Sequence, residues 1–387
     1  MEGIQITWAD DVHIANAMVH TTIKSFRQNS SPLISLFKVY KDLDDKKFTE
    51  ELFRKTIRHQ SETKNIIEEI KLYPKIEYTS IYFGGGTPSL LSLKSIESIM
   101  NSIQYKEDSE ITLELNPKNM TLQNLQELRK LGINRLSIGT QSFNDKILKT
   151  LGRDHSAEDA IETYRNAIKS GFDNISLDLI FATPNQTIEE LRNDLEKIKE
   201  LRPNHISIYS LIWEEGTYFW KQRKEGKLSE ISEDLEAEMF EEIITTLTNE
   251  GYIHYEISSF CKPGFESIHN SKYWDNKEFI GVGSGASSYF EGKRYSNKKK
   301  IYKYYEDIKM GIRPIDIETI EEIDETEKVK LSKMLGLRRV DKGIIYDKND
   351  EAINKLISKQ LLVLENDRVR LTYKGVFLAN DVFVEFI

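Results

Sequence analysis

The chain has 387 residues, of which 54 are Lys or Arg and 63 are Asp or Glu, so its formal net charge at pH 7 is −9. With 39% hydrophobic and 30% charged residues, this is the composition of a globular protein with a large core. The mild acidity gives no reason to expect nucleic acid as a partner. The single cysteine, Cys261, excludes a disulfide framework within the chain and an iron–sulfur cluster held by several of its own thiolates.

Neither a membrane-spanning helix nor a secretion signal is visible in the sequence. No run of about 18 apolar residues occurs, which is the length that a spanning helix requires. The first thirty residues contain Asp10, Asp11, His13 and Lys24 and lack the apolar core of a signal peptide. We therefore expect a cytoplasmic protein.

Strands and helices alternate through the middle of the chain. Residues 1–45 show no clear period, and residues 46–73 form a polar helical run. From residue 78, β-branched runs alternate with amphipathic helical stretches; the expected strands are 79–83, 111–115, 135–139, 174–180, 205–211 and 254–260. This rhythm is typical of parallel βαβ units. It predicts an α/β fold with a partial, TIM-like β/α barrel, with a doubly wound open sheet as the alternative.

The rhythm stops after residue 290. Two helical runs, a hairpin turning at residues 365–367 and a final helix follow, which is a winged-helix-like α+β arrangement. The sequence thus predicts three domains: a divergent N-terminal segment with the first barrel strand (1–77), the barrel (78–290) and a C-terminal domain for packing or partner contact (291–387).

The strongest local motif is "YFGGGTPSLL", in which a strand runs into Gly84, Gly85, Gly86 and Thr87, with a helix expected to start near Ser89. Glycines at the end of a strand let backbone groups approach a ligand, or form a nest for an anion. The spacing matches neither the dinucleotide fingerprint nor a P-loop. A tight strand-to-helix turn is the alternative interpretation.

Polar residues recur where successive predicted strands end, namely Glu114, Gln141, Asp178, Tyr209 and Ser210. The carboxyl ends of parallel barrel strands meet at one mouth, where barrel enzymes bind their substrates. We therefore expect these side chains to share a site. For any one of them, a buried polar residue bonded to the backbone is the alternative.

A family resemblance rests on a series of motifs that includes "YFGGGTPSLL", "ELNP", "LGINRLSIGTQSFND", "LGRDHSAEDA", "GFDNISLDLIFATPNQT", "HNSKYW" and "GVGSGASSYF". From residue 78 to the C-terminus the chain closely resembles the HemW-like haem chaperones. These are members of the radical S-adenosylmethionine (SAM) superfamily and relatives of the oxygen-independent coproporphyrinogen III oxidases of porphyrin metabolism.

The resemblance implies two sets of site residues. Gly85, Gly86 and Thr87 would hold the amino group of SAM through backbone carbonyls, and the ribose and methionine carboxylate would be held by Glu114, Gln141, Arg153 and Asp178. The "HNSKYW" motif would contact haem through His269, Asn270, Tyr273 and Trp274, with His269 as axial iron ligand and the two aromatic rings stacked on the macrocycle. The 281–290 segment would be a further backbone-approach loop, or else a flexible connector.

The sequence departs from the family at its N-terminus. The family's C-x-x-x-C-x-x-C motif for a [4Fe–4S] cluster is expected within residues 9–25, which read "ADDVHIANAMVHTTIKS" and contain no cysteine. His13 and His20 do not hold such a cluster unaided. Without the cluster no electron reaches SAM, so radical chemistry is not expected. The segment is either a natural divergence or the product of a frameshift or gene-model error in the first fifty or so residues.

Three functions remain open. The first is a chaperone that binds haem, together with SAM, and delivers haem to acceptor haemoproteins, including acceptors at the membrane. The second is an oxygen-independent coproporphyrinogen III oxidase. The third is a catalytically silent paralogue that binds SAM or haem only as a ligand.

Overall fold

The computed structural model describes residues 3–7, 61–86, 88–213, 215 and 217–386. The expected cluster segment, with His13 and His20, lies outside these residues. Two compact units are present, each built from two separated stretches of chain: Met1–Ser109 with Phe279–Glu322, and Glu110–Glu278 with Ile323–Ile387. These units are defined by contacts within the structure and combine separated stretches of the chain. They do not test the three domain ranges expected from the sequence, which stay a prediction.

The first unit contains a sheet in the order β12-β11-β10-β9-β1-β2. Its strands are β1 (Gly3–Thr7), β2 (Tyr78–Gly84), β9 (Phe279–Val282), β10 (Ser287–Phe290), β11 (Lys293–Ser296) and β12 (Glu321–Glu322). Strand β1 is parallel to β2 and to β9, and the other pairs are antiparallel. The first barrel strand expected within the N-terminal segment 1–77 is therefore present as β1.

Helices of the first unit include residues 61–70, α4 (Leu93–Met100) and α12 (Ile301–Lys309). Helix α4 begins later than the sequence suggested. A single 3-10 turn, Pro88–Leu90, follows the glycine run, and Ser92 then caps the helix by accepting the N–H of Ser95.

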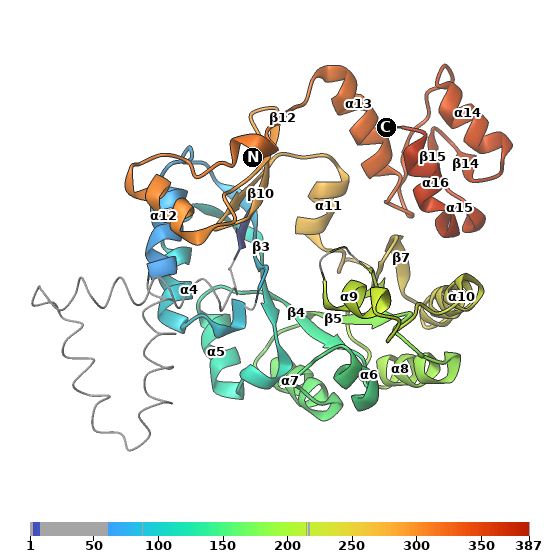
Figure 1. Cartoon of the computed structure of the whole chain (residues 1–387), viewed down its shortest axis with the longest axis horizontal. Coiled ribbons are helices and arrows are strands. Elements are labelled where there is room, and N and C mark those ends of the chain that lie inside the picture. The colour runs from blue at the N-terminus through green and yellow to red at the C-terminus, as the bar shows by residue number, and fades with distance from the viewer. Residues whose placement is uncertain (1–2, 8–60, 87, 214, 216, 387) are drawn as a thin grey trace, which may run out of the picture. The chain divides into compact units, whose positions relative to one another are not determined.

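The second unit carries the regular βα rhythm. Parallel strands β3 (Tyr105–Leu115, which begins in the first unit), β4 (Arg135–Gln141), β5 (Asn174–Phe181) and β6 (His205–Ser210) alternate with helices α5 (Leu122–Lys130), α6 (Asp145–Thr150), α7 (Ala157–Lys169) and α8 (Ile188–Leu201). Figure 1 shows these helices lying along one side of the strands. Capping boxes begin α7 at Ser156 and α8 at Thr187, as the sequence favours.

The prediction of a single sixth strand is wrong. Residues 254–260 form no single strand but an antiparallel hairpin, β7 (Ile253–Glu256) and β8 (Ser259–Cys261), after helices α9 (Tyr218–Lys224) and α10 (Glu233–Asn249). Strand β8 also pairs antiparallel with β6. The turn between the two strands, Ile257–Ser258, carries no glycine or proline that would have marked it.

Helix α11 (Ile268–Trp274) follows the hairpin, and the C-terminal stretch of the same unit begins with α13 (Glu325–Gly336). The rest of that stretch is β13 (Ile344–Ile345), α14 (Glu351–Ser358), β14 (Leu362–Glu365), β15 (Arg368–Leu371), α15 (Tyr373–Phe377) and α16 (Ala379–Val384). The predicted helices and hairpin are present, β13 adds a third strand in the order β13-β15-β14, and the last helix is divided in two. In the part of the chain that the structure describes, no helix is both long and apolar enough to cross a membrane.

Candidate functional site

Strands β3 to β6 present a polar face. Side chains alternate along each strand, so that the aliphatic residues share one face and the polar residues the other. The polar set is Glu110, Thr112, Glu114, Arg135, Ser137, Ser176, Asp178, His205 and Ser207. The strand register aligns them, since Glu114 lies opposite Ser137, Ser137 opposite Ser176, and Asp178 opposite Ser207.

Asp178 is held in place by two serine hydroxyls. Ser137 donates to its Oδ2 at 2.5 Å, and Ser176 donates to its Oδ1 at 2.7 Å. Burial raises the pKa of Asp178, and these hydrogen bonds oppose that shift by stabilising the ionised form. The carboxylate is therefore preoriented by its neighbours, within β5 and three residues before the end of that strand.

Gln141 ends β4, the strand beside β5, and Glu114 lies one residue before the end of β3, the next strand in the sheet. Gln141 has a positive φ of 64° where the β4–β5 register shifts. A Cβ on Gly139 would lie only 2.9 Å from Gln141 Nε2, so this glycine makes room for the amide. Glu114 is half-buried, and its charge adds to the burial that raises the pKa of Tyr273. Adjacent parallel strands thus bring Glu114, Gln141 and Asp178 to one edge of the sheet.

The other site residues predicted on these strands and loops differ in exposure and in hydrogen bonding. Arg153 is exposed in the turn that follows α6, and Tyr209 at the end of β6 is 43% exposed. Ser210 donates to Glu236 of α10 at 2.5 Å.

The glycine turn belongs to the first unit. Gly85 and Gly86 have φ values of 70° and 53°, which a residue with a side chain rarely adopts. A Cβ on Gly85 would lie 2.8 Å from Cγ2 of Thr7, at the end of β1. Both observations explain why glycine stands at this turn, and Thr87 lies outside the described residues.

A buried carboxylate fixes helix α11, which carries the "HNSKYW" motif. Glu110 of β3 accepts the backbone N–H groups of Ile268 and His269 at 3.0 and 2.8 Å. Its Oε2 lies 3.8 Å from Nε of Arg135, and both side chains are at most 3% exposed. Ser267 caps the helix by accepting the N–H of Asn270. The start of α11 is thereby tied to the interior of the sheet.

His269 faces inward. It is 1% exposed, and its Nε2 lies 2.7 Å from the hydroxyl of Tyr273 one turn later. Burial, with the nearby charges of Lys272 and Arg135, lowers the pKa of His269 to about 3. The imidazole is neutral at physiological pH, which is the form that binds iron.

The C-terminal stretch packs against the other end of α11. The guanidinium carbon of Arg338 lies 4.4 Å from the ring centroid of Trp274. Asn276 donates to Ser332 of α13 at 3.0 Å. A flat ligand stacking on Trp274 would therefore use the ring face opposite Arg338.

Several residues of this region were absent from the sequence-based candidates, namely Glu110, Arg135, Ser176, His205 and Tyr255. The signal for all except Tyr255 was in the strands themselves. In "RLSIG", "NISLDL" and "HISIYS" a polar residue occupies every second position of an otherwise aliphatic strand. Such alternation indicates one polar face on the sheet. The sequence-based candidates include only the polar residues toward the C-terminal part of each strand.

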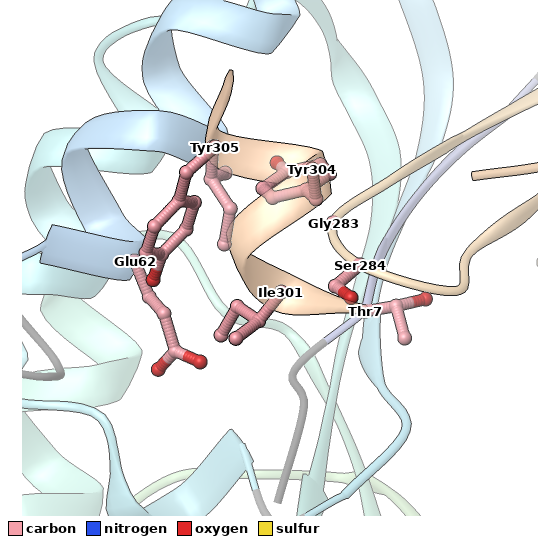
Figure 2. Close-up of a pocket in the computed structure, with 8 residues that line it drawn as sticks. Thr7, Glu62, Gly283, Ser284, Ile301, Tyr304 and Tyr305 are labelled. Atoms are coloured by element: carbon pink, nitrogen blue, oxygen red, sulfur yellow. The ribbon is translucent and has the colours of Figure 1, made fainter. Parts of the chain in front are cut away.

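A small cavity lies in the first unit (Figure 2). Its volume is about 10 Å³, which suits about one water molecule. Figure 2 shows Glu62, Ile301, Tyr304 and Tyr305 around it, with Gly283 and Ser284 of the loop after β9. The cavity is too small for SAM or a porphyrin. A larger one of about 310 Å³, between α13 and Phe386 in the second unit, is lined by none of the predicted site residues.

The 281–290 segment is closely packed. A Cβ on Gly281 would lie 2.1 Å from the carbonyl oxygen of Ser287, and one on Gly283 would lie 2.0 Å from that of Thr7. The Gly283 N–H donates to the buried Glu69 at 2.8 Å. Gly281 and Gly283 therefore serve close backbone packing.

An iron–sulfur cluster does not fit this chain. Cys261, the single cysteine, is fully buried in β8, where burial raises the pKa of its thiol to about 12. Among the described residues there is no group of three or more His, Cys, Asp or Glu side chains placed to hold a metal ion. A three-thiolate cluster site therefore cannot be assembled from its own cysteines.

Comparison with known proteins identifies the family. A model described as the Radical SAM superfamily matches residues 51–198. The heme chaperone HemW of Lactococcus lactis is 36% identical over 340 residues, which cover 84% of this chain and 88% of that protein. This chain belongs to the HemW family. The Bacillus subtilis heme chaperone HemW is 34% identical over 324 residues, covering 80% of this chain and 85% of that protein.

A solved structure confirms the fold of this HemW-family protein. Coproporphyrinogen III oxidase (HemN) from Escherichia coli, described as a radical SAM enzyme, matches with a TM-score of 0.73 at 22% identity, over 85% of this chain and 83% of that one. The partial, TIM-like barrel predicted from the sequence is confirmed, in preference to a doubly wound open sheet. Membership of the superfamily implies SAM and a [4Fe–4S] cluster as its cofactors, and the second of these is the one for which this chain lacks ligands.

Proposed function

We propose that this HemW-family protein binds haem through helix α11 and delivers it to acceptor haemoproteins, including acceptors at the membrane, without radical chemistry. The observation that carries the proposal is the 36% identity to a heme chaperone HemW over 84% of the chain. The absence of cysteines for a cluster argues against the oxidase alternative, since electron transfer to SAM needs that cluster. Likeness to HemN supports the fold and not that activity.

Haem iron would be bound by Nε2 of His269. The imidazole is already neutral, so no proton has to leave a charged ring. Its present partner is the hydroxyl of Tyr273, and exchanging that bond for iron costs about 0.5–1.5 kcal/mol net. The side chain must also turn out of its buried position. Asn270 and the Trp274 ring face opposite Arg338 would then contact the macrocycle.

SAM would bind as a ligand at the edge formed by Glu114, Gln141 and Asp178. Carboxylates accept hydrogen bonds from ribose hydroxyls, and Ser137 and Ser176 already orient Asp178 to do so. Arg153 would pair with the methionine carboxylate. The roles expected for Gly85, Gly86 and Thr87 stay predictions, and this proposal rests on the second unit.

Haem titration of the purified protein tests the proposal. Parent protein should shift the Soret band of haemin with one-to-one stoichiometry, and His269→Ala should abolish the shift that nitrogen ligation produces. His155→Ala is the matched control, because His155 is also buried and its Nε2 lies 3.1 Å from the carbonyl oxygen of Thr140. That variant should keep the shift even if it unfolds at a lower temperature.

Transfer to an acceptor completes the test. Haem-loaded protein mixed with an apo-haemoprotein should lose its Soret signature as the acceptor gains one. A parent protein that leaves the haemin spectrum unchanged, or a His269→Ala variant with the parent's spectrum and affinity, would refute the assignment of haem to α11.

A further inference from the structure

A chain of hydrogen bonds runs through the second unit from Asp178 to the start of α11. Ser176 Oγ donates to Asp178 at 2.7 Å, and Nδ1 of His205 lies 2.8 Å from the same Ser176 oxygen. Nε2 of His205 lies 2.8 Å from the hydroxyl of Tyr255. That hydroxyl accepts the backbone N–H of Ser267, the residue that caps α11, at 3.3 Å. The candidate SAM edge and the candidate haem helix are joined through one histidine.

The direction of every bond follows from counting protons. An ionised Asp178 only accepts, so Ser176 gives it its single proton. The Ser176 oxygen must then accept the Nδ1 proton of His205. A neutral imidazole with its proton on Nδ1 accepts at Nε2, so Tyr255 donates there and its oxygen is left to accept the N–H of Ser267.

His205 is suited to this role because it stays neutral. Burial lowers its pKa well below the ordinary value, and the charge of Arg135 acts in the same direction. The other titratable groups around it are Tyr255, which is bonded to its Nε2, Cys261, which lies opposite it on β8, and Asp178, which is reached through Ser176. The relay therefore works by the position of a proton on a neutral ring and not by a change of charge.

A relay that starts from a protonated Asp178 has each hydrogen bond from Asp178 to Tyr255 reversed, and it holds the start of α11 less strongly. If Asp178 carries a proton and donates it to Ser176, the Ser176 proton turns to Nδ1 of His205, and the imidazole proton moves to Nε2. Tyr255 then faces two donors, that Nε2–H and the N–H of Ser267, and its own hydroxyl proton no longer points to His205. The bond that orients Ser267 is weakened as a result.

We propose that His205 is a positioning residue that couples the two ligands, so that SAM at Asp178 and haem at α11 strengthen each other's binding. The inference rests on the proposed function. Ribose hydroxyls donating to Asp178 keep it an ionised acceptor, which selects the arrangement that holds Ser267. Thermodynamic linkage makes the effect reciprocal. One net hydrogen bond corresponds to a coupling of about three- to tenfold in affinity.

Calorimetric titration measures the coupling. SAM is titrated into parent protein with and without bound haemin, and the ratio of the two dissociation constants is the coupling factor, expected at about three to ten. His205→Phe and Tyr255→Phe each cut the relay while keeping a ring, and the factor should fall to about one in both. If His205→Phe fails to fold, as judged by circular dichroism, Tyr255→Phe carries the test.

His254→Phe is the matched control. His254 lies on β7 of the same sheet with its Nε2 3.1 Å from the carbonyl oxygen of Ile257, and it has no bond to the relay. This variant should keep the parent's coupling factor. Nitrogen NMR supplies a second measurement that packing alone does not change, since His205 should show the Nδ1–H tautomer when SAM is bound.

The outcomes separate the two proposals. Absence of SAM or haemin binding by parent protein overturns the proposed function, and this inference with it. Binding of both ligands with a coupling factor of one overturns the inference alone. So does a parent-like factor in His205→Phe, or an Nε2–H tautomer in the SAM complex.

Discussion

Glu69, in the helical stretch 61–70 of the first unit, provides a quantitative test of the electrostatics. Its carboxylate is fully buried and accepts the N–H of Gly283 at 2.8 Å, the side-chain amide of Asn297 at 2.6 Å and the hydroxyl of Tyr304 at 2.6 Å. Burial raises its pKa from 4.5 to about 7 despite these donors. Glu69 therefore titrates near neutrality.

The sign of the effect follows from proton counts. Between pH 4.5 and about 7 the folded chain holds a proton on Glu69 that the unfolded chain has lost, so stability falls as pH rises through this window. A displacement of about 2.5 pKa units corresponds to about 2–3 kcal/mol lost between pH 5 and pH 8. For a unit of this size that is roughly 5–10 °C in melting temperature.

Glu69→Gln removes the titration. The amide cannot satisfy all three donors, so the variant is less stable than the parent at every pH, but its offset should shrink by about 2–3 kcal/mol from pH 5 to pH 8. Melting temperatures across that range measure it. Glu68→Gln, at an exposed position on the same helix, should run parallel to the parent. Parallel profiles for parent and Glu69→Gln would contradict the reasoning.

Three further predictions concern local geometry and ligand binding. Gly283→Ala should lower the free energy of unfolding by at least about 2 kcal/mol, because its φ is 112° and the new Cβ would lie 2.0 Å from the Thr7 carbonyl oxygen. Gly292→Ala is the control in the same unfolding assay and should cost about 1 kcal/mol, because nothing lies within 4 Å of its new Cβ. Haem affinity should stay flat from pH 5 to pH 8 because the pKa of His269 is about 3, and a fall centred near pH 6.5 would exclude His269 as the ligand. Glu110→Gln should lower stability by about 3–5 kcal/mol, measured by denaturant unfolding, and weaken haemin binding, since it breaks a buried ion pair and loosens the start of α11.

Local patterns account for what could be predicted from the sequence. Strands β2, β4, β5 and β6 lie within two residues of the predicted ranges, because a period of two and the capping residues of the helices between them act over short distances. Strands β9, β10 and β11 lie where no strand is predicted from the sequence. The same patterns placed Glu114, Gln141 and Asp178 at strand ends. The prediction for residues 254–260 is wrong because the turn at Ile257–Ser258 carries no glycine or proline, so that two short strands have the pattern of one.

The sequence by itself determined the barrel rhythm, the family motifs and the lack of cysteines for a cluster, since each depends on residue identity or on near neighbours. Tertiary structure alone decided which polar groups meet. Glu69 binds Gly283, 214 residues away, and Glu110 binds the N–H of His269, 159 residues away. His205 joins Asp178 to α11 only because β5, β6 and β7 are packed in one sheet. No local pattern encodes such partners, because they are selected by how separate elements fill the interior together.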